Sequence, residues 1–164
     1  MNAIEYAKGQ LSEAFNLFNV CAGGMDEGQY NFQPPGTCNA PAQSHVHAMS
    51  SMDFFLNAML RSGQMRWPQL AEQHGLPANP MEIWRYQGKV PYEAMQEYAR
   101  AVQQDVLDYV GSLKDDDLDR IVKTQFFGEK SVAWILMLAV DHTMGHGGDI
   151  AAVKGMQGLK GLPF

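Results

Sequence analysis

Two histidines interrupt the most apolar helix-forming stretch of the chain. The run SVAWILMLAV is followed by DHTMGHGGDI, in which His142 and His146 stand four residues apart. On an α-helix, residues at this spacing lie on one face, about 6 Å apart at Cβ. Two such imidazoles can each give a lone pair to one divalent metal ion, whereas an unpaired polar atom in a core costs about 1–3 kcal/mol. The spacing by itself is compatible both with a metal site and with a metal-free pair whose rings bond to carbonyl groups.

The same two histidines continue an apolar stripe of their predicted helix. Residues on this side of the helix recur at helical spacing, namely Val132, Ile135, Ala139, His142, His146 and Val153. This period predicts that both imidazoles point into the core of a helical protein.

Several familiar catalytic motifs are absent around the pair. The residues between the histidines are TMG, so the HExxH motif of zinc proteases is missing. Ala139 and Thr143 stand three residues before His142 and His146, so the ExxH pairs of di-iron bundles are missing as well. No GxSxG, Walker or dinucleotide-binding motif occurs in the chain. Further metal ligands must therefore come from the other histidines.

The remaining histidines lie in two places. His74 is part of AEQHG, in a stretch rich in Gly and Pro, and is expected at the surface. His45 and His47 lie in SHVHAMSSMDFF, on a predicted helix, where their separation puts them roughly 160° apart around the axis. Only one of them can face a common centre with His142 and His146. Three histidines with an open coordination position suit Zn²⁺, Ni²⁺, Fe²⁺ or Mn²⁺.

The pattern of neighbouring residues leaves the choice between His45 and His47 open. The side of His45 is apolar, with Met49, Met52, Leu56 and Met59, which favours His45 as the inward residue. The side of His47 is smaller and more polar, with Ser50, Ser51, Phe54 and Ala58, as in either a pocket wall or a half-exposed face. Ser50 lies one turn after His47 and is the candidate for contact with bound water or substrate, and packing at the edge of the core is equally compatible with its position.

Other polar residues and glycines lie near these candidate ligands. Asp141 and Asp149 flank the histidine pair and are expected on a solvated helix face, with a hydrogen bond to a ligand imidazole as the alternative. Asp53 is likewise expected on a helix surface, with pairing to a charged group in the pocket as the alternative. The glycines at 145, 147 and 148 each cost about 1 kcal/mol relative to alanine within a helix. Their clustering indicates close approach of another helix or of a ligand.

The whole chain has the composition of a globular protein. Hydrophobic residues make up 46% and charged residues 18% of the 164 residues, which predicts one domain spanning 1–164. The net charge is −6 without a basic cluster, so no nucleic-acid partner is expected. The longest apolar run, residues 132–140, has about half the length of a membrane span. The N-terminus lacks a signal-peptide core and the two cysteines form no disulfide or metal motif, so we expect a cytoplasmic location away from membranes.

Four helical segments must position the histidines. Periodicity predicts long helices over residues 2–20, 39–60, 91–113 and 131–156, with Asn39 capping the second. Residues 61–90 are too long for a simple turn and are predicted to form a crossover with one or two small helices. The acidic turn KDDDLDR is expected to lead into a short helix through DLDRIV, and RIVKTQFFG is the only candidate strand. The predicted class is all-α, a four-helix bundle.

These segments resemble the DinB superfamily, which includes the YfiT-like bundles. The ending HTMGHGGDIAAVKGMQGLKGLPF is similar to that family's closing signature of His, three residues, His, then Gly, a helical stretch and Lys-Gly-hydrophobic-Pro. In the family's second helix a histidine precedes an aromatic pair by seven residues, and His47 stands seven before Phe54 whereas His45 stands nine before it. The acidic turn is also similar, and Gly147 departs from the family by following His146 where an aromatic residue or histidine is common. The aromatic spacing favours His47.

The resemblance implies both an architecture and a function. It implies an up-down-down-up bundle with the long crossover between the second and third helices, and a homodimer. It implies one divalent metal ion held by His47, His142 and His146. The implied activity is that of a metal-dependent hydrolase or thiol (S-)transferase acting on a small molecule, with a low-molecular-weight thiol as co-substrate. The alternative is a non-catalytic metal-binding or stress-response protein, for which we expect a closed site with a fourth protein ligand.

Overall fold

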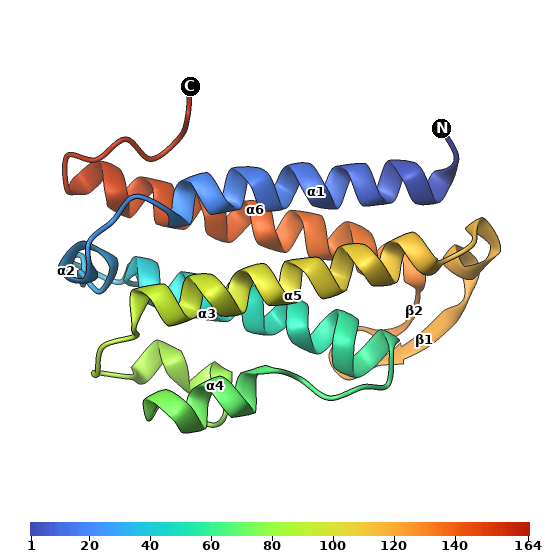
Figure 1. The fold of residues 1–164 in the computed structure, drawn as a ribbon, viewed down its shortest axis with the longest axis horizontal. Helices are drawn as coiled ribbons and strands as arrows, with labels where there is room; N and C mark the ends of the chain where they lie inside the picture. Colours follow the sequence, from blue (N-terminus) through green and yellow to red (C-terminus); the bar gives the residue numbers. More distant parts are fainter.

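Four long helices lie side by side in the computed structural model, which describes residues 1–164 (Figure 1). They are α1 (Ala3–Ala22), α3 (Pro41–Met52) with its π-helical continuation η1 (Asp53–Leu60), α5 (Tyr92–Ser112) and α6 (Val132–Met156). Helices α1 and α6 run in one direction, and α3 and α5 run in the other (Figure 1). Helices α1 and α3 each pack against both α5 and α6. The predicted all-α bundle with an up-down-down-up course is confirmed.

Two of the four long helices, α1 and α6, begin at a residue whose side chain caps the helix. Asn2 accepts a hydrogen bond from the backbone N–H of Glu5, whose side chain accepts one from the N–H of Asn2. Helix α6 begins after Ser131, whose hydroxyl accepts from the N–H of Trp134 at 3.2 Å. The predicted cap of α3 was wrong. Ala40 precedes the helix, not Asn39, and its N–H donates to the Gln43 side chain at 3.0 Å.

The second long helix changes its winding halfway. It is α-helical to Met52 and π-helical from Asp53 to Leu60, where a single α-helix was predicted. Periodicity could not reveal the change, because eight residues of either winding keep Leu56 and Leu60 on the buried side.

The crossover between η1 and α5 contains two small helices, as predicted. These are α4 (Trp67–His74) and the 3₁₀-helix η2 (Pro80–Arg85). Helix α4 packs on α5 and η2 packs on α3. Trp67 is fully buried, and its indole N–H donates to the Pro77 carbonyl at 3.1 Å. Gly75 ends α4 in the left-handed region at φ 63°, which glycine adopts at low cost. The crossover is therefore anchored on the bundle at both of its helices.

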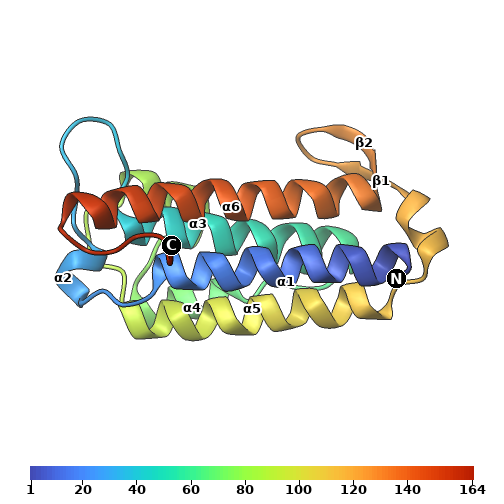
Figure 2. The same ribbon diagram turned by 90° about the horizontal axis from the view of Figure 1, so that it is seen from above.

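Short elements close the two ends of the bundle (Figure 2). Helix α2 (Glu27–Tyr30) lies at one end, in the connection between α1 and α3. At the other end, strands β1 (Ile121–Thr124) and β2 (Gly128–Ser131) form an antiparallel hairpin in which Ile121 is opposite Ser131. The predicted helix through DLDRIV is only partly present. The 3₁₀-helix η3 (Asp115–Asp119) ends early because the β-branched Ile121 and Val122 belong to the hairpin.

The core is formed by apolar side chains from all four long helices and from the crossover. Among its largest fully buried members are Phe18, Met52, Trp67, Ile83 and Ile135. Cys21 is buried, Cys38 is exposed, and both are free thiols. None of the helices has the length and apolar character that crossing a membrane requires.

Candidate metal centre

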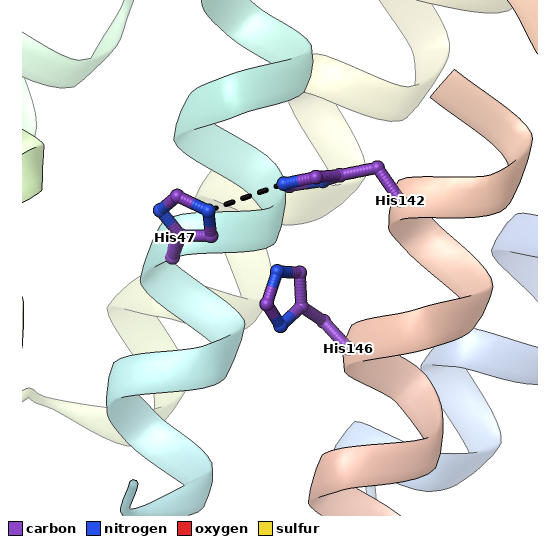
Figure 3. A group of neighbouring side chains, drawn as sticks. All are labelled: His47, His142 and His146. Atoms are coloured by element: carbon purple, nitrogen blue, oxygen red, sulfur yellow. Dashed lines mark hydrogen bonds between the residues drawn. The ribbon is translucent and has the colours of Figure 1, made fainter. Parts of the chain in front are cut away.

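Helices α3 and α6 bring three histidines together from distant parts of the chain (Figure 3). His47 lies on α3, and His142 and His146 lie one turn apart on α6. The Nε2 atoms of His47 and His142 are 3.1 Å apart, and one nitrogen from each of the three rings lies within 4.8 Å of the others. Two nitrogens bound to one Zn²⁺ at about 2.0–2.1 Å lie about 2.9–3.4 Å apart, depending on the coordination angle. The three histidines therefore form a group that can hold a metal ion.

The surroundings keep two of these rings neutral. Burial, together with the neighbouring His146, lowers the pKa of His47 to about 4. Burial also lowers the pKa of His142 to about 3, with smaller contributions from His146 and His47. Near pH 7 both rings consequently carry a free lone pair, which is the form that binds metals.

The third ring, that of His146, is oriented by a carboxylate. Its Nδ1 atom lies 3.0 Å from Oδ2 of Asp149, which leaves Nε2 as the free nitrogen of this ring. Both expectations for Asp149 hold. Its side chain is 60% exposed, as on a solvated helix face, and it bonds to the His146 imidazole. Asp141 has no hydrogen bond to the histidines and lines a cavity between α1 and α6 instead.

The histidine pair does not lie on the innermost stripe of α6, in contrast to the prediction. Thr143 and Gly147 are the buried residues at this level, whereas His142 and His146 are half-buried. Helix α6 packs against both α1 and α3, so it buries a wider face than a single stripe. The histidines occupy the edge of that face, next to α3.

The two histidines of α3 have separate environments. His45 is fully buried in the core, where its Nδ1 lies 3.1 Å from the Tyr30 hydroxyl and its ring meets Phe18 edge-on. Burial lowers the pKa of His45 to about 3. The apolar stripe thus correctly identified His45 as the inward residue. However, the histidine pair of α6 lies at the edge of the core, and His47 is the histidine of α3 that lies beside it.

Aromatic side chains surround the three histidines. The Trp84 indole lies 4.6 Å from the His47 ring and 6.2 Å from the His146 ring, measured between centroids. Phe55 meets His142 edge-on at 6.3 Å. No local sequence pattern links Trp84 to the histidines. Its position depends on the path of the crossover.

Other residues near the candidate ligands are placed differently from expectation. Ser50 is buried and its hydroxyl donates to the His47 carbonyl at 3.4 Å, so it points along its own helix. His74 is exposed, as predicted. Of the three clustered glycines only Gly147 lies against another helix, and its neighbours there are Phe18 and Cys21. A Cβ at Gly147 would meet Phe18 of α1 at 3.5 Å, and one at Gly145 or Gly148 would meet nothing within 4 Å.

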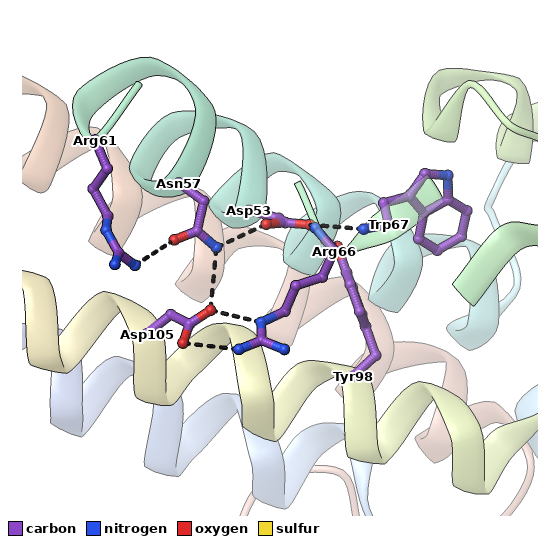
Figure 4. Close-up of polar contacts among 7 residues, drawn as sticks. All are labelled: Asp53, Asn57, Arg61, Arg66, Trp67, Tyr98 and Asp105. Atoms are coloured by element: carbon purple, nitrogen blue, oxygen red, sulfur yellow. Dashed lines mark hydrogen bonds and ion pairs between the residues drawn. The ribbon is translucent and has the colours of Figure 1, made fainter. Parts of the chain in front are cut away.

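Asp53 is fully buried, which corrects its predicted place on a helix surface (Figure 4). Its Oδ2 atom accepts hydrogen bonds from the backbone N–H groups of Arg66 and Trp67, at 2.7 and 2.9 Å, and from the Tyr98 hydroxyl at 2.9 Å. Its Oδ1 atom accepts from the Asn57 amide at 2.8 Å. The carboxylate therefore joins η1, the start of α4 and helix α5.

Fold and site together define a class of protein: an up-down-down-up four-helix bundle with three histidines gathered between two antiparallel helices. Sequence comparison narrows this class. Residues 10–150 match the family described as the DinB superfamily, and the chain belongs to this superfamily. A comparison with curated proteins found no match.

Solved structures share the fold, among them the following two. The conserved protein from Enterococcus faecalis superposes with a TM-score of 0.77 at 16% identity, over 94% of this chain and 96% of the other. A DinB-like protein from Bacillus subtilis superposes with a TM-score of 0.67 at 18% identity, over 97% and 96% of the two chains. The similarity extends over nearly the whole of each chain, including the crossover.

Proposed function

We propose that this chain is a metal-dependent enzyme, either a hydrolase or a thiol (S-)transferase. One divalent ion, Zn²⁺, Ni²⁺, Fe²⁺ or Mn²⁺, is held by His47, His142 and His146. The observation that carries the proposal is the convergence of one nitrogen from each of three half-buried imidazoles, a group that no fourth side chain completes, since the Asp149 carboxylate bonds to Nδ1 of His146. Three protein ligands with an open position are typical of catalytic metal sites, whereas structural sites have four.

The residues present fit such an ion. The 3.1 Å separation between the Nε2 atoms of His47 and His142 is compatible with two ligands of one metal. Both rings are neutral near pH 7, and Asp149 directs the Nδ1–H of His146 away from the centre. The His146 side chain is 21% exposed, so a small molecule can reach the group.

The role of the chain in this function is to hold the ion and to leave one side of it accessible. An ion bound by neutral ligands keeps its full charge and lowers the pKa of a bound water or thiol. The superfamily resemblance supports a low-molecular-weight thiol as co-substrate and a small electrophile as its partner. Ser50 is no longer a candidate for substrate contact through its hydroxyl, because that group bonds to the His47 carbonyl.

A non-catalytic metal-binding or stress-response role is the second candidate function. One observation favours it: the Trp84 indole packs on two of the three imidazoles and restricts the approach to them. An apolar cavity of about 380 Å³ lies elsewhere, between α1 and α6. The two functions are distinguished by whether the metal-loaded protein converts a substrate.

Metal content tests the ligand set. We expect purified protein to carry about one divalent ion per chain and His47→Gln or His142→Gln to lose it, since removing one of three ligands weakens binding by at least about 10-fold. His45→Gln is the matched control, because it lies on the same helix and contacts Tyr30 instead. Elemental analysis of the folded variants provides the measurement. Loss of metal in His45→Gln with retention in His47→Gln would overturn the assignment.

Turnover tests the enzymatic function. Metal-loaded protein is assayed for thiol consumption with a panel of small electrophiles and for hydrolysis of small esters and amides. We expect activity that depends on the metal and is lost in His47→Gln. A fully loaded protein that is inert toward the whole panel would support the non-catalytic role.

The proposal includes a homodimer that uses the outer side of α1 and α6. The cavity there is lined mainly by apolar residues, among them Ala7, Ala133 and Leu136. Tyr6 and Met137 border it with 59% and 52% of their surfaces exposed. Large apolar side chains gathered around an apolar hollow are typical of a surface that is covered by a partner.

A further inference from the structure

In each of the three imidazoles, Nδ1 is the outer nitrogen, which points away from the common centre. These three atoms differ in their hydrogen bonding. Nδ1 of His146 has Asp149 as its partner at 3.0 Å. Nδ1 of His47 and Nδ1 of His142 are buried and have no hydrogen-bond partner. In metal sites this outer nitrogen normally donates to an acceptor that fixes the ring plane. Two of the three candidate ligands therefore need another means of orientation.

For His47, packing against the indole of Trp84 can fix the orientation of the ring. Its centroid is 4.6 Å from that of His47, at an interplanar angle of 44°, which is closer than the rings of His146 and His142 at 4.9 and 5.0 Å. The indole also contacts His146, at 6.2 Å. It thus packs on the two rings at the α3–α6 contact.

Trp84 is itself firmly placed. It belongs to η2, whose first turn is capped by Asn79 through a hydrogen bond from the Met81 N–H at 3.1 Å. The neighbouring Ile83 is fully buried, and its carbonyl accepts from the Gln43 amide of α3 at 3.1 Å. The helix carrying Trp84 is therefore bonded to the helix carrying His47.

We propose that Trp84 is a positioning residue for His47, holding its imidazole by aromatic packing where His146 is held by a carboxylate. The indole limits rotation of the ring and keeps Nε2 directed at His142 and His146. This inference rests on the proposed metal site. It makes the crossover a part of that site, since η2 contributes a residue that acts through a ligand.

Affinity for Co²⁺, measured by competition with a chromogenic chelator, tests the proposal. Trp84→Leu keeps an apolar side chain without an aromatic face, and we expect it to bind Co²⁺ about 10-fold more weakly. Trp84→Phe restores an aromatic ring and should stay within about 3-fold of the wild type. Trp134→Leu is the matched control, because Trp134 is also half-buried but packs on Phe127 and Lys130.

A spectroscopic measurement accompanies the titration. Co²⁺ quenches an adjacent indole, so wild-type fluorescence should fall on binding, and most of this change should vanish in Trp84→Phe but persist in Trp134→Phe. The visible absorption band of bound Co²⁺ should shift in Trp84→Leu and not in Trp84→Phe, because only the former frees the His47 ring. Circular dichroism establishes that each variant is folded.

The outcomes separate this inference from the proposed function. Wild-type protein that binds no Co²⁺ would overturn both. Wild-type binding with unchanged affinity in folded Trp84→Leu, or with equal losses in Trp84→Phe and Trp84→Leu, would overturn the role of Trp84 alone. Equal losses in Trp84→Leu and Trp134→Leu would also overturn it, since the effect would then be general to half-buried tryptophans.

Discussion

At the scale of single residues, neighbouring positions on one helix have unrelated roles. His45 is enclosed by the core and bonds to Tyr30, while His47, two residues later, faces α6 and its histidine pair. Both have lowered pKa values, chiefly because burial disfavours the charged ring. Only His47 has a nitrogen directed at other potential ligands. The same chemical group thus packs inside the core in one case and can bind a metal in the other.

Burial of His45 predicts a pH dependence of stability in the metal-free protein. The ring takes up a proton below pH 6.5 when the chain is unfolded, but only near pH 3 when it is folded. The unfolded state therefore binds the extra proton between these values, and the free energy of unfolding falls as pH falls, by about 1.4 kcal/mol per pH unit for this residue. Above pH 6.5 the residue adds no pH dependence.

Urea unfolding at about pH 6, 5 and 4 measures this effect. His45→Gln should flatten the dependence by about one proton, whereas His74→Gln, at an exposed position, should leave it unchanged. Parallel curves for the wild type and His45→Gln would contradict the prediction.

At the scale of elements, one buried carboxylate joins three helices. Asp53 begins η1, accepts from the first backbone N–H groups of α4 and accepts from Tyr98 of α5. Burial and the Asp53 carboxylate both raise the pKa of Tyr98, so this hydroxyl stays protonated and remains a donor. The crossover is thereby attached to the bundle at the residue where the second helix changes its winding.

We predict that Asp53→Ala lowers the free energy of unfolding by about 3 kcal/mol, because it leaves buried donors without an acceptor. Arg66→Ala is the control within the same cluster. Arg66 pairs with Asp105 at 2.6 Å but is 50% exposed, and an exposed pair contributes less than about 1 kcal/mol. Denaturant unfolding of both variants gives the comparison, and equal losses would contradict the role assigned to Asp53.

At the scale of the whole molecule, the two proposed functions belong to different faces of the bundle. The side where α3 meets α6 carries the three histidines, and the side where α1 meets α6 carries the apolar cavity. Helix α6 contributes to both. Dimerisation through the α1–α6 side would leave the histidine group accessible to small molecules.

The dimer is tested by light scattering after size-exclusion chromatography. We expect twice the chain mass of 18.2 kDa for the wild type and a single chain for Met137→Glu, which places a charge in the apolar contact. Met156→Glu is the matched control, since Met156 is on the same helix, is 56% exposed and does not line the cavity. A monomeric wild type, or a dimer that survives Met137→Glu, would contradict the proposed interface.

The sequence alone determined what depends on local spacing. Helical periodicity defines the four long helices within a few residues, and the four-residue separation of His142 and His146 places them on one face. The Gly- and Pro-rich composition of residues 61–90 marks the crossover. These features arise from interactions within one helix or turn, which neighbouring residues specify.

Only the tertiary structure decided which residues meet across elements. The rotation of α3 against α6 brings His47, not His45, to the histidine pair, and the path of the crossover places Trp84 on His47. Contacts with α4 and α5 bury Asp53, which periodicity had placed at the surface. Such contacts depend on the relative positions of whole helices, and a period read within one helix has no information about its neighbours.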